Sequence, residues 1–174
     1  MAKHAAVCFR TRSDGVVTFN AAKTHAPCQR QWDAFNVVQK TTNARELEAL
    51  KRLRRVGATR TPRLLYGATK PNGRAEVRMT KVGTALTDLG GRRDGGGKAL
   101  VRTHAKQLRA DLRTALTELK AAGVLHQDMC ARNVTWDGAH FHVIDFDIVD
   151  FATDWSVDAE LEEAYDALLR WAAK

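Results

Sequence analysis

The stretch from 124 to 134, VLHQDMCARNV, constrains this chain more than any other feature of its sequence. It places Asp128 and Asn133 five residues apart, and Asp145 follows 17 residues after Asp128. The segment Trp136-Asp-Gly138 between them predicts a tight turn, because Asp-Gly favours the positive φ angles of hairpin turns. The sequence therefore predicts a loop that carries Asp128 and Asn133 and faces Asp145 at the end of a short β-hairpin.

These side chains are the ones that phosphoryl transfer requires. A carboxylate orients or deprotonates the acceptor hydroxyl, and oxygen ligands hold Mg²⁺ against the nucleotide phosphates. Asp128 suits the first task, and Asn133 with Asp145 suits the second. Taken singly, each residue is better explained by structure: Asp128 and Asn133 as turn or cap residues, Asp145 as a strand end and His126 as a satisfied core histidine. Their joint order and spacing favour the chemical interpretation.

The pair HQDMCARNV and VIDFD resembles the HxDxxxxN catalytic loop and the DFG segment of the protein-kinase-like superfamily. The stretch ending in LKAAGVLHQD and the segment EVRMTKVGTAL, similar to a fifth strand and hinge, extend the resemblance over most of the chain. It implies that Asp128 is the catalytic aspartate, that Asn133 and Asp145 bind the metal, and that His126 ties the loop to the metal-binding segment. IDFD looks most like the lipopolysaccharide kinases of the Kdo/WaaP type and other small atypical kinases, and ARNV is similar to the tyrosine-kinase loop.

The resemblance adds further candidates around the loop and the hinge. Arg132 stands beside Asn133, where it contacts a substrate or offsets the charge of Asp147, which replaces the glycine of DFG. Arg132 and Asp147 are each explained equally well as surface side chains without a functional role. Thr80 and Val82 lie in the hinge, where the adenine of ATP is expected to bind.

The resemblance also implies a strand lysine for the nucleotide phosphates and a glutamate on the following helix. Glu46 in RELEAL matches the glutamate, although it is almost equally well explained as the capping-box partner of Asn43. Two lysines compete, Lys40 after AFNVVQ and Lys23 after VVTFNAA. We favour Lys40, since it leaves three strands before the helix. The phosphate loop then falls on 12–16, which lacks GxGxxG and offers fewer backbone N–H groups to a phosphate.

Hydrophobic periodicity predicts the surrounding elements. Alternation predicts a hairpin over 5–23 and strands near 34–40, 63–66, 75–79 and 141–146. Periodic leucines predict helices over 43–56 and 99–122 and from 156 onward.

The glycine-rich segment GGRRDGGGK separates the predicted hinge from the 99–122 helix. It fails the Walker A pattern, because Arg92 stands at the first glycine position and Ala99 follows the lysine. We interpret it as a flexible linker.

We therefore predict an α+β, minimal two-lobed protein-kinase-like fold. Residues 1–81 would form an N-lobe of a small antiparallel sheet and one helix, and residues 82–174 a reduced, mainly helical C-lobe. The stretch after Asp147 holds 27 residues. We expect it to lack the usual activation segment and most C-lobe helices.

Charge and composition indicate which partners and which cellular location to expect for the protein. The formal charge of +8 and the pI near 9.8 favour affinity for polyanions, although the basic run Lys51–Arg55 is more typical of a solvated helix face. The three cysteines stand at unrelated spacings, which predicts reduced thiols. No apolar run reaches the roughly 20 residues that a membrane span needs. We expect a cytoplasmic protein with no transmembrane segment.

The predicted function is an ATP- and Mg²⁺-dependent phosphotransferase that acts on a hydroxyl of a protein, a sugar or a small molecule. The alternative is a catalytically weak or inactive kinase-like module that binds a nucleotide or a partner. A basic nucleic-acid-associated protein is a third hypothesis, which only the net charge supports.

Overall fold

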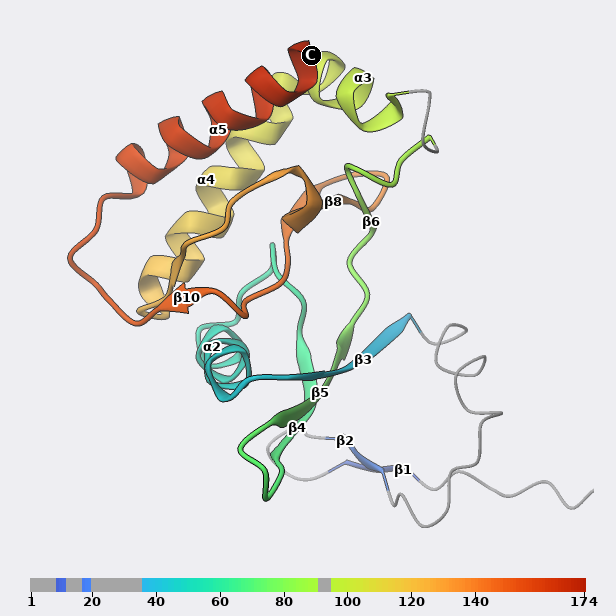
Figure 1. Ribbon diagram of the computed structural model, residues 1–174, viewed down its shortest axis with the longest axis vertical. Coiled ribbons are helices and arrows are strands. Elements are labelled where there is room, and N and C mark those ends of the chain that lie inside the picture. The colour runs from blue at the N-terminus through green and yellow to red at the C-terminus, as the bar shows by residue number, and fades with distance from the viewer. Residues whose placement is uncertain (1–8, 12–16, 20–35, 91–94) are drawn as a thin grey trace, which may run out of the picture.

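The computed structural model describes residues 9–11, 17–19, 36–90 and 95–174 (Figure 1). Its first half contains β1 (Phe9–Thr11), β2 (Val17–Phe19), β3 (Val37–Thr42), α2 (Ala44–Arg55), β4 (Leu64–Thr69), β5 (Ala75–Thr80) and β6 (Thr84–Ala85). Its second half contains α3 (Gly96–Thr103), α4 (Ala105–Ala121), β7 (Leu125–His126), the 3-10 turn η1 (Ala131–Asn133), β8 (Val134–Trp136), β9 (Phe141–Val143), β10 (Val149–Asp150) and α5 (Val157–Ala173).

A three-stranded antiparallel sheet, ordered β3-β5-β4, supports α2. Strand β5 lies in the middle and is buried at Val77, which pairs with Lys40 of β3. Helix α2 packs against β4 and β5, and its Leu47, Leu50 and Leu53 are all buried. Their spacing of three residues is the apolar stripe that predicts an amphipathic helix. The predicted helix and its sheet are therefore confirmed.

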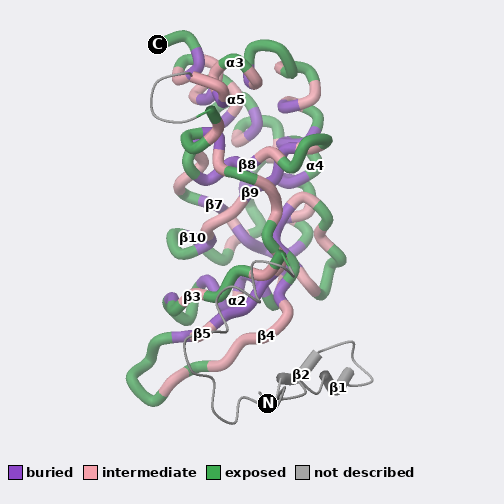
Figure 2. The backbone as a smooth tube through the Cα atoms, turned by 90° about the vertical axis from the view of Figure 1, so that its right-hand side faces the viewer, coloured by how far each residue is buried: buried purple, intermediate pink, exposed green. Residues whose placement is uncertain are grey.

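The remaining helices cover the other end of the molecule, where α3 and α4 both pack against α5 (Figures 1 and 2). Leu108, Leu112, Leu116 and Leu119 of α4 are buried at helical spacing, in the same core as Leu161 of α5. The hairpin of β8 and β9 lies against α4 and extends the small sheet begun by β6. The predicted α+β class, with small antiparallel sheets and a mainly helical second half, is confirmed.

Several predicted boundaries are wrong in detail. The helix expected over 99–122 begins at Gly96 and is broken at His104 into α3 and α4. The strand expected over 141–146 ends at Val143, because Asp145 adopts a left-handed backbone conformation that a strand does not continue through. The third strand runs over Val37–Thr42, two residues past its predicted end. Of the hairpin predicted over 5–23, β1 and β2 pair with Phe9 opposite Phe19, and the turn at 12–16 lies outside the described residues.

The glycine-rich segment is not a linker throughout. Gly95 caps α3 with φ 57°, and the helix begins at Gly96. Gly97 is buried where the chain passes Leu86, and a Cβ built on it would lie 1.9 Å from the Leu86 carbonyl oxygen. This glycine is therefore required by close packing, whereas residues 91–94 of the segment lie outside the description.

Replacing Gly97 by Ala is expected to destabilise the protein by about 1–3 kcal/mol, because the added methyl group overpacks against backbone that cannot rotate away. A flexible linker would instead be unaffected or slightly stabilised by the same change. Urea unfolding monitored by circular dichroism measures the difference. Ala99→Gly serves as the matched control on an exposed position of the same helix, with an expected loss of about 1 kcal/mol from helix propensity alone.

No helix in the described part of the chain is both long and apolar enough to span a bilayer. Cys130 has a free thiol, and Cys8 and Cys28 lie outside the described ranges.

Candidate active site

The structure brings three residues that the sequence separates widely into one ion-paired group. The Lys40 Nζ atom lies 2.8 Å from Glu46 Oε1 and 2.5 Å from Asp145 Oδ1. Glu46 is fully buried, and the side chains of Lys40 and Asp145 are 31% and 36% exposed. We call these residues the Lys40 group. It joins β3, α2 and the segment after β9 across the interface between the sheet and the helical part.

Local structure explains how Glu46 reaches Lys40. Asn43 caps α2, and its Oδ1 accepts a hydrogen bond of 2.8 Å from the Glu46 backbone N–H. The carboxylate of Glu46 pairs with Lys40 instead of closing the capping box. Glu46 thus occupies the third helical position, and its carboxylate meets the strand lysine.

Lys40 is held in its charged form. Burial alone would lower the pKa of Lys40, but its hydrogen bonds to Asp145 and Glu46 and their negative charges outweigh burial and raise the pKa. A charged ammonium group at this point suits the binding of anionic phosphates.

The catalytic-loop candidates form a second group. Asp128 Oδ2 accepts hydrogen bonds of 2.7 Å from Arg132 and 2.9 Å from Asn133 Nδ2. Asn133 Nδ2 also donates to the Asp128 carbonyl oxygen, and η1 supplies the tight turn that folds it back. Burial would raise the pKa of Asp128, but the hydrogen bond and charge of Arg132 dominate and lower it, so the carboxylate is ionised.

His126 connects this loop to the metal-binding candidate. Its Nδ1 accepts from the Asp128 backbone N–H, and its Nε2 donates to the Ile144 carbonyl oxygen at 3.0 Å. The two partners together assign the neutral tautomer with the proton on Nε2, and burial lowers the pKa of His126, which favours the same form. The ring also meets Phe146 edge-on at 5.3 Å. The structure thus shows the scaffold contact that the resemblance implied.

Asp145 is presented to Lys40 by an uncommon backbone conformation. Its φ of 66° lies in the left-handed region, which costs energy for a residue with a side chain. The Asn133 carbonyl oxygen accepts from the Ile144 N–H at 2.9 Å and fixes the chain just before it. Such outliers concentrate at functional sites, where the surrounding structure enforces them.

The hinge candidates are engaged by other parts of the protein. Thr80 Oγ1 accepts from the Arg63 N–H at 2.9 Å, and the Val82 carbonyl oxygen accepts from the Thr135 hydroxyl. These contacts fasten the segment after β5 to β4 and β8. They do not join Thr80 or Val82 to the Lys40 group. Lys23 and the phosphate-loop candidate at 12–16 lie outside the described residues.

Two further features near Lys40 were missed from the sequence. Asn43 Nδ2 donates to the Asp147 carbonyl oxygen, which attaches the start of α2 to the IDFD segment. A cavity of about 470 Å³ opens there, lined by Lys40, the 41–43 segment, the turn at 72–74 and Asp147. No sequence signal indicated that the turn at 72–74 faces Lys40.

Asn133 and Asp145 fit a magnesium ion by the chemistry of their donors. Mg²⁺ prefers oxygen ligands and is usually held by one or two carboxylates together with substrate phosphates and water. Asn133 uses its Nδ2 toward Asp128, so the amide oxygen is the atom it would offer. Within the described part of the chain, no group of three or more His, Cys, Asp or Glu side chains is placed so that it could hold a metal ion.

Comparison with protein-family models and with curated proteins finds no match. Among solved structures, the chain is similar to the kinase PK-1 of the Cydia pomonella granulovirus, with a TM-score of 0.48 and 17% sequence identity. The match covers 66% of this chain and 43% of the viral kinase. The chain thus spans less than half of that protein.

Proposed function

We propose that this protein is an ATP- and Mg²⁺-dependent phosphotransferase with a reduced protein-kinase-like fold. The observation that carries the proposal is the Lys40 group, in which a strand lysine meets a helix glutamate and an aspartate 105 residues away. Phosphoryl transfer in protein kinases requires this lysine–glutamate pair and the metal-binding aspartate to be in place together. We divide the chain into lobes at residues 1–81 and 82–174 on the same grounds.

Each residue has a role in the proposed reaction. Lys40 would bind the nucleotide phosphates, and Asn133 and Asp145 would hold Mg²⁺, which neutralises charge that develops on the phosphates. Asp128, ionised and oriented by Asn133, would accept the proton of the acceptor hydroxyl. Arg132 would set the position of that carboxylate, and the 80–82 segment would contact the adenine.

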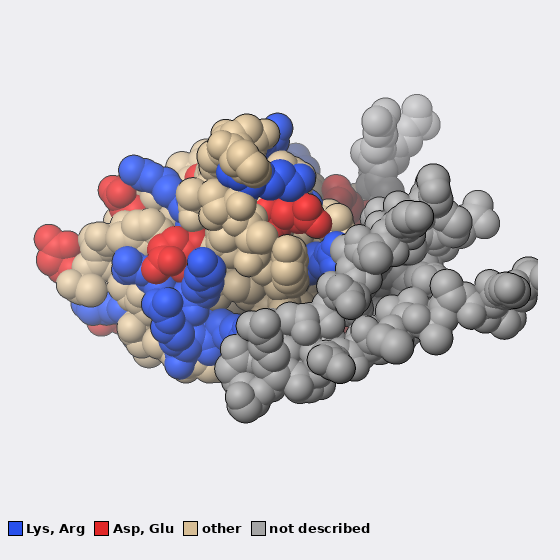
Figure 3. All heavy atoms as spheres, turned by 90° about the horizontal axis from the view of Figure 1, so that it is seen from below, with Lys and Arg blue, Asp and Glu red and all other residues tan. Residues whose placement is uncertain are grey.

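The acceptor is a hydroxyl of a protein, a sugar or a small molecule. The narrower likeness of IDFD to lipopolysaccharide kinases of the Kdo/WaaP type and the expected cytoplasmic location stay predictions. The net charge separately predicts affinity for polyanions. Lys and Arg side chains gather on part of the surface seen in Figure 3, but polyanion affinity is not needed for the transfer reaction.

The second candidate function is a kinase-like module that binds nucleotide without turnover. One observation favours it: Lys40 holds Asp145 Oδ1, an oxygen that metal binding would use, at 2.5 Å. The absence of GxGxxG at 12–16 points the same way, because fewer backbone donors reach a phosphate.

Mg²⁺-ATP is expected to raise the melting temperature by about 5–10 °C at a hundredfold excess over the Kd, since a ligand that binds only the native state adds about 2.7 kcal/mol there. Asp145→Asn should remove the magnesium dependence of this shift. Asparagine tolerates the left-handed conformation, so the change isolates the lost charge. Differential scanning fluorimetry measures both effects.

Two controls separate the candidate functions. Tripolyphosphate should give a smaller shift than ATP; an equal shift that high salt removes would indicate a basic surface only. Radiolabelled γ-phosphate should move to an acceptor, to the protein itself or to water. An ATP-selective shift without any transfer would favour the binding module, and no selective shift would exclude both.

A further inference from the structure

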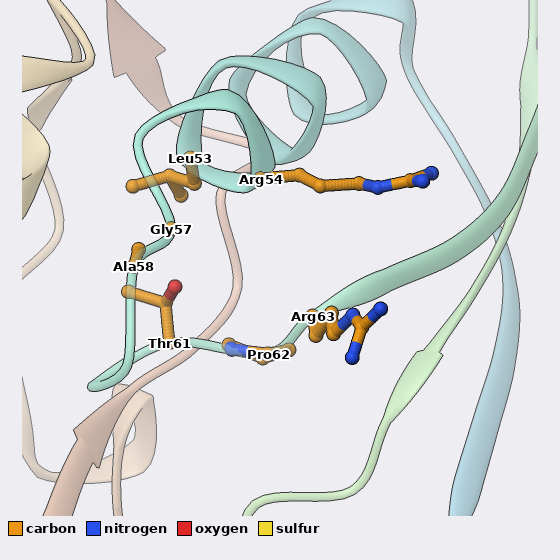
Figure 4. Close-up of a pocket in the computed structure, with 7 residues that line it drawn as sticks. All are labelled: Leu53, Arg54, Gly57, Ala58, Thr61, Pro62 and Arg63. Atoms are coloured by element: carbon orange, nitrogen blue, oxygen red, sulfur yellow. The ribbon is translucent and has the colours of Figure 1, made fainter. Parts of the chain in front are cut away.

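A second cavity lies at the end of α2 opposite to Glu46. Its volume is about 370 Å³, and it is enclosed by the last turn of α2 and the segment 57–63 that leads into β4 (Figure 4). This volume is within the range of small-molecule sites, at its lower end. The residues that line it belong to neither the Lys40 group nor the catalytic loop, so the proposed phosphotransferase reaction does not use it.

Thr61 carries the first indication of a ligand. Its side chain is only 4% exposed, yet its hydroxyl has no hydrogen-bond partner within the described protein. Figure 4 shows the hydroxyl oxygen turned toward the space beneath α2. Buried hydroxyl groups are nearly always hydrogen-bonded, because removing one from water without a partner is unfavourable. A polar atom of a ligand in the cavity would satisfy this hydroxyl.

Two arginines on different elements flank the same opening. Arg54 extends from the last turn of α2, and Arg63 lies on the opposite side, directly before β4 (Figure 4). The planar guanidinium group offers a fork of donors that matches carboxylate and phosphate oxygens. None of the described residues that line the cavity has an acidic side chain.

The negative end of α2 does not cancel this positive charge. Gly57, with φ 70°, allows the chain to fold back so that the Ala58 N–H donates to the Leu53 carbonyl oxygen and the Gly57 N–H to that of Arg54. This is a Schellman arrangement, which satisfies the terminal carbonyl groups of a helix. The Leu53 and Arg54 carbonyl oxygens at this end of the helix are therefore already hydrogen-bonded.

Two acidic side chains of α4 bind the segment that lines the cavity. Glu118 of α4 accepts from the backbone N–H groups of Thr59 and Arg60 and from the Thr59 hydroxyl. Asp111 accepts from the Arg60 guanidinium at 3.0 Å. These bonds hold the segment that forms one wall of the cavity against α4, so neither carboxylate is among the residues that line it.

We propose that this cavity binds a small organic anion, a phosphate monoester or carboxylate on a compact apolar group. The apolar part would lie against Leu53, Ala58 and Pro62, of which Leu53 is 1% exposed. The anionic oxygens would contact Arg54 and Arg63, and one oxygen would accept a hydrogen bond from the Thr61 hydroxyl. A bare polyanion satisfies the arginines but leaves the apolar wall unused, so the site is distinct from general attraction to polyanions.

Titration of the isotope-labelled protein with phenyl phosphate tests the proposal by NMR. The amide signals of Thr61 and Arg63 are expected to shift and saturate, while those around Asp128 stay in place. Benzoate replaces phenyl phosphate in a parallel arm and identifies the preferred anionic group. Inorganic phosphate and benzyl alcohol should each bind at least about tenfold more weakly, because each lacks one half of the recognised chemistry.

Two variants are compared for affinity. Arg63→Gln should weaken phenyl phosphate binding about tenfold, since it removes one charge-assisted contact. Arg55→Gln is the matched control, because Arg55 is an exposed arginine of the same helix end that does not line the cavity. Equal losses in the two variants would indicate a diffuse basic surface and overturn the proposal, as would the absence of saturable shifts at millimolar phenyl phosphate.

Thr61→Val provides a readout that a merely structural threonine would not give. Valine has nearly the same shape and removes the unpaired hydroxyl, so the free protein should melt at the same or a higher temperature while affinity falls several-fold. A lower melting temperature would show that the hydroxyl already has a partner in the protein, and would remove the main support for the site. Lys40→Met should leave phenyl phosphate binding unchanged, which keeps this test independent of the proposed nucleotide site.

Discussion

Replacing Asp128 by Asn is expected to lower the rate of phosphoryl transfer by at least about a hundredfold and to leave Mg²⁺-ATP affinity nearly unchanged. A positioned general base typically contributes 10²–10⁴-fold to the rate. The amide keeps an oxygen that can accept from Arg132 and Asn133, so the loop should retain its shape. What it loses is the ionised carboxylate that would receive the proton of the acceptor.

The measurement is single-turnover transfer from radiolabelled ATP, with nucleotide affinity determined separately by calorimetry. Asp150→Asn is the matched control: it is the same chemical change at an exposed aspartate of β10, whose contacts are with Gln127 and Arg45. It should keep full activity. If Asp128→Asn loses nucleotide affinity as much as rate, Asp128 is a structural residue of the loop and the catalytic assignment is wrong.

The sequence could predict the catalytic-loop geometry because its residues are close in the chain. Asp128 and Asn133 are five residues apart, and the 3-10 turn η1 ends at Asn133. The hairpin that brings Ile144 back to Asn133 is encoded by the Asp-Gly of Trp136-Asp-Gly138. Short loops with strong turn signals leave few conformations. The contact of His126 with the segment before Asp145 was implied by the resemblance.

The contacts between the sheet and the helical part were harder to predict. That the strand lysine would pair with Glu46 was implied by the resemblance. Its contact with Asp145, 105 positions away, was not predicted, because no local pattern links the two residues. At Gly97 the sequence instead suggested a feature that the structure does not have. Its glycine-rich surroundings suggested flexibility, whereas the tight approach of Leu86 explains the missing side chain. Composition cannot distinguish a glycine that allows motion from one that allows contact.

Loss of the Lys40 charge is the second change with a large expected effect, this time on stability. Lys40→Met keeps the aliphatic stem but leaves the Glu46 carboxylate, which is fully buried, without its ion-pair partner. Breaking a buried pair from one side costs about 3–5 kcal/mol, and the partial exposure of Lys40 places the expectation at the lower end, about 3 kcal/mol. For a chain of this length that corresponds to a fall of roughly 6–12 °C in melting temperature.

A double-mutant cycle shows whether the loss comes from the ion pair. Glu46→Gln removes the buried charge, so Lys40→Met combined with Glu46→Gln should be more stable than Lys40→Met alone. Lys51→Ala, at an exposed lysine of α2, and Lys23→Ala should each change stability by no more than about 0.5 kcal/mol. Strictly additive effects in the cycle would mean that Lys40 and Glu46 do not interact in solution. In that case a loss of Mg²⁺-ATP affinity in Lys23→Ala, with none in Lys40→Met, would assign the phosphate contact to Lys23 and move the strand lysine to the hairpin that contains β2.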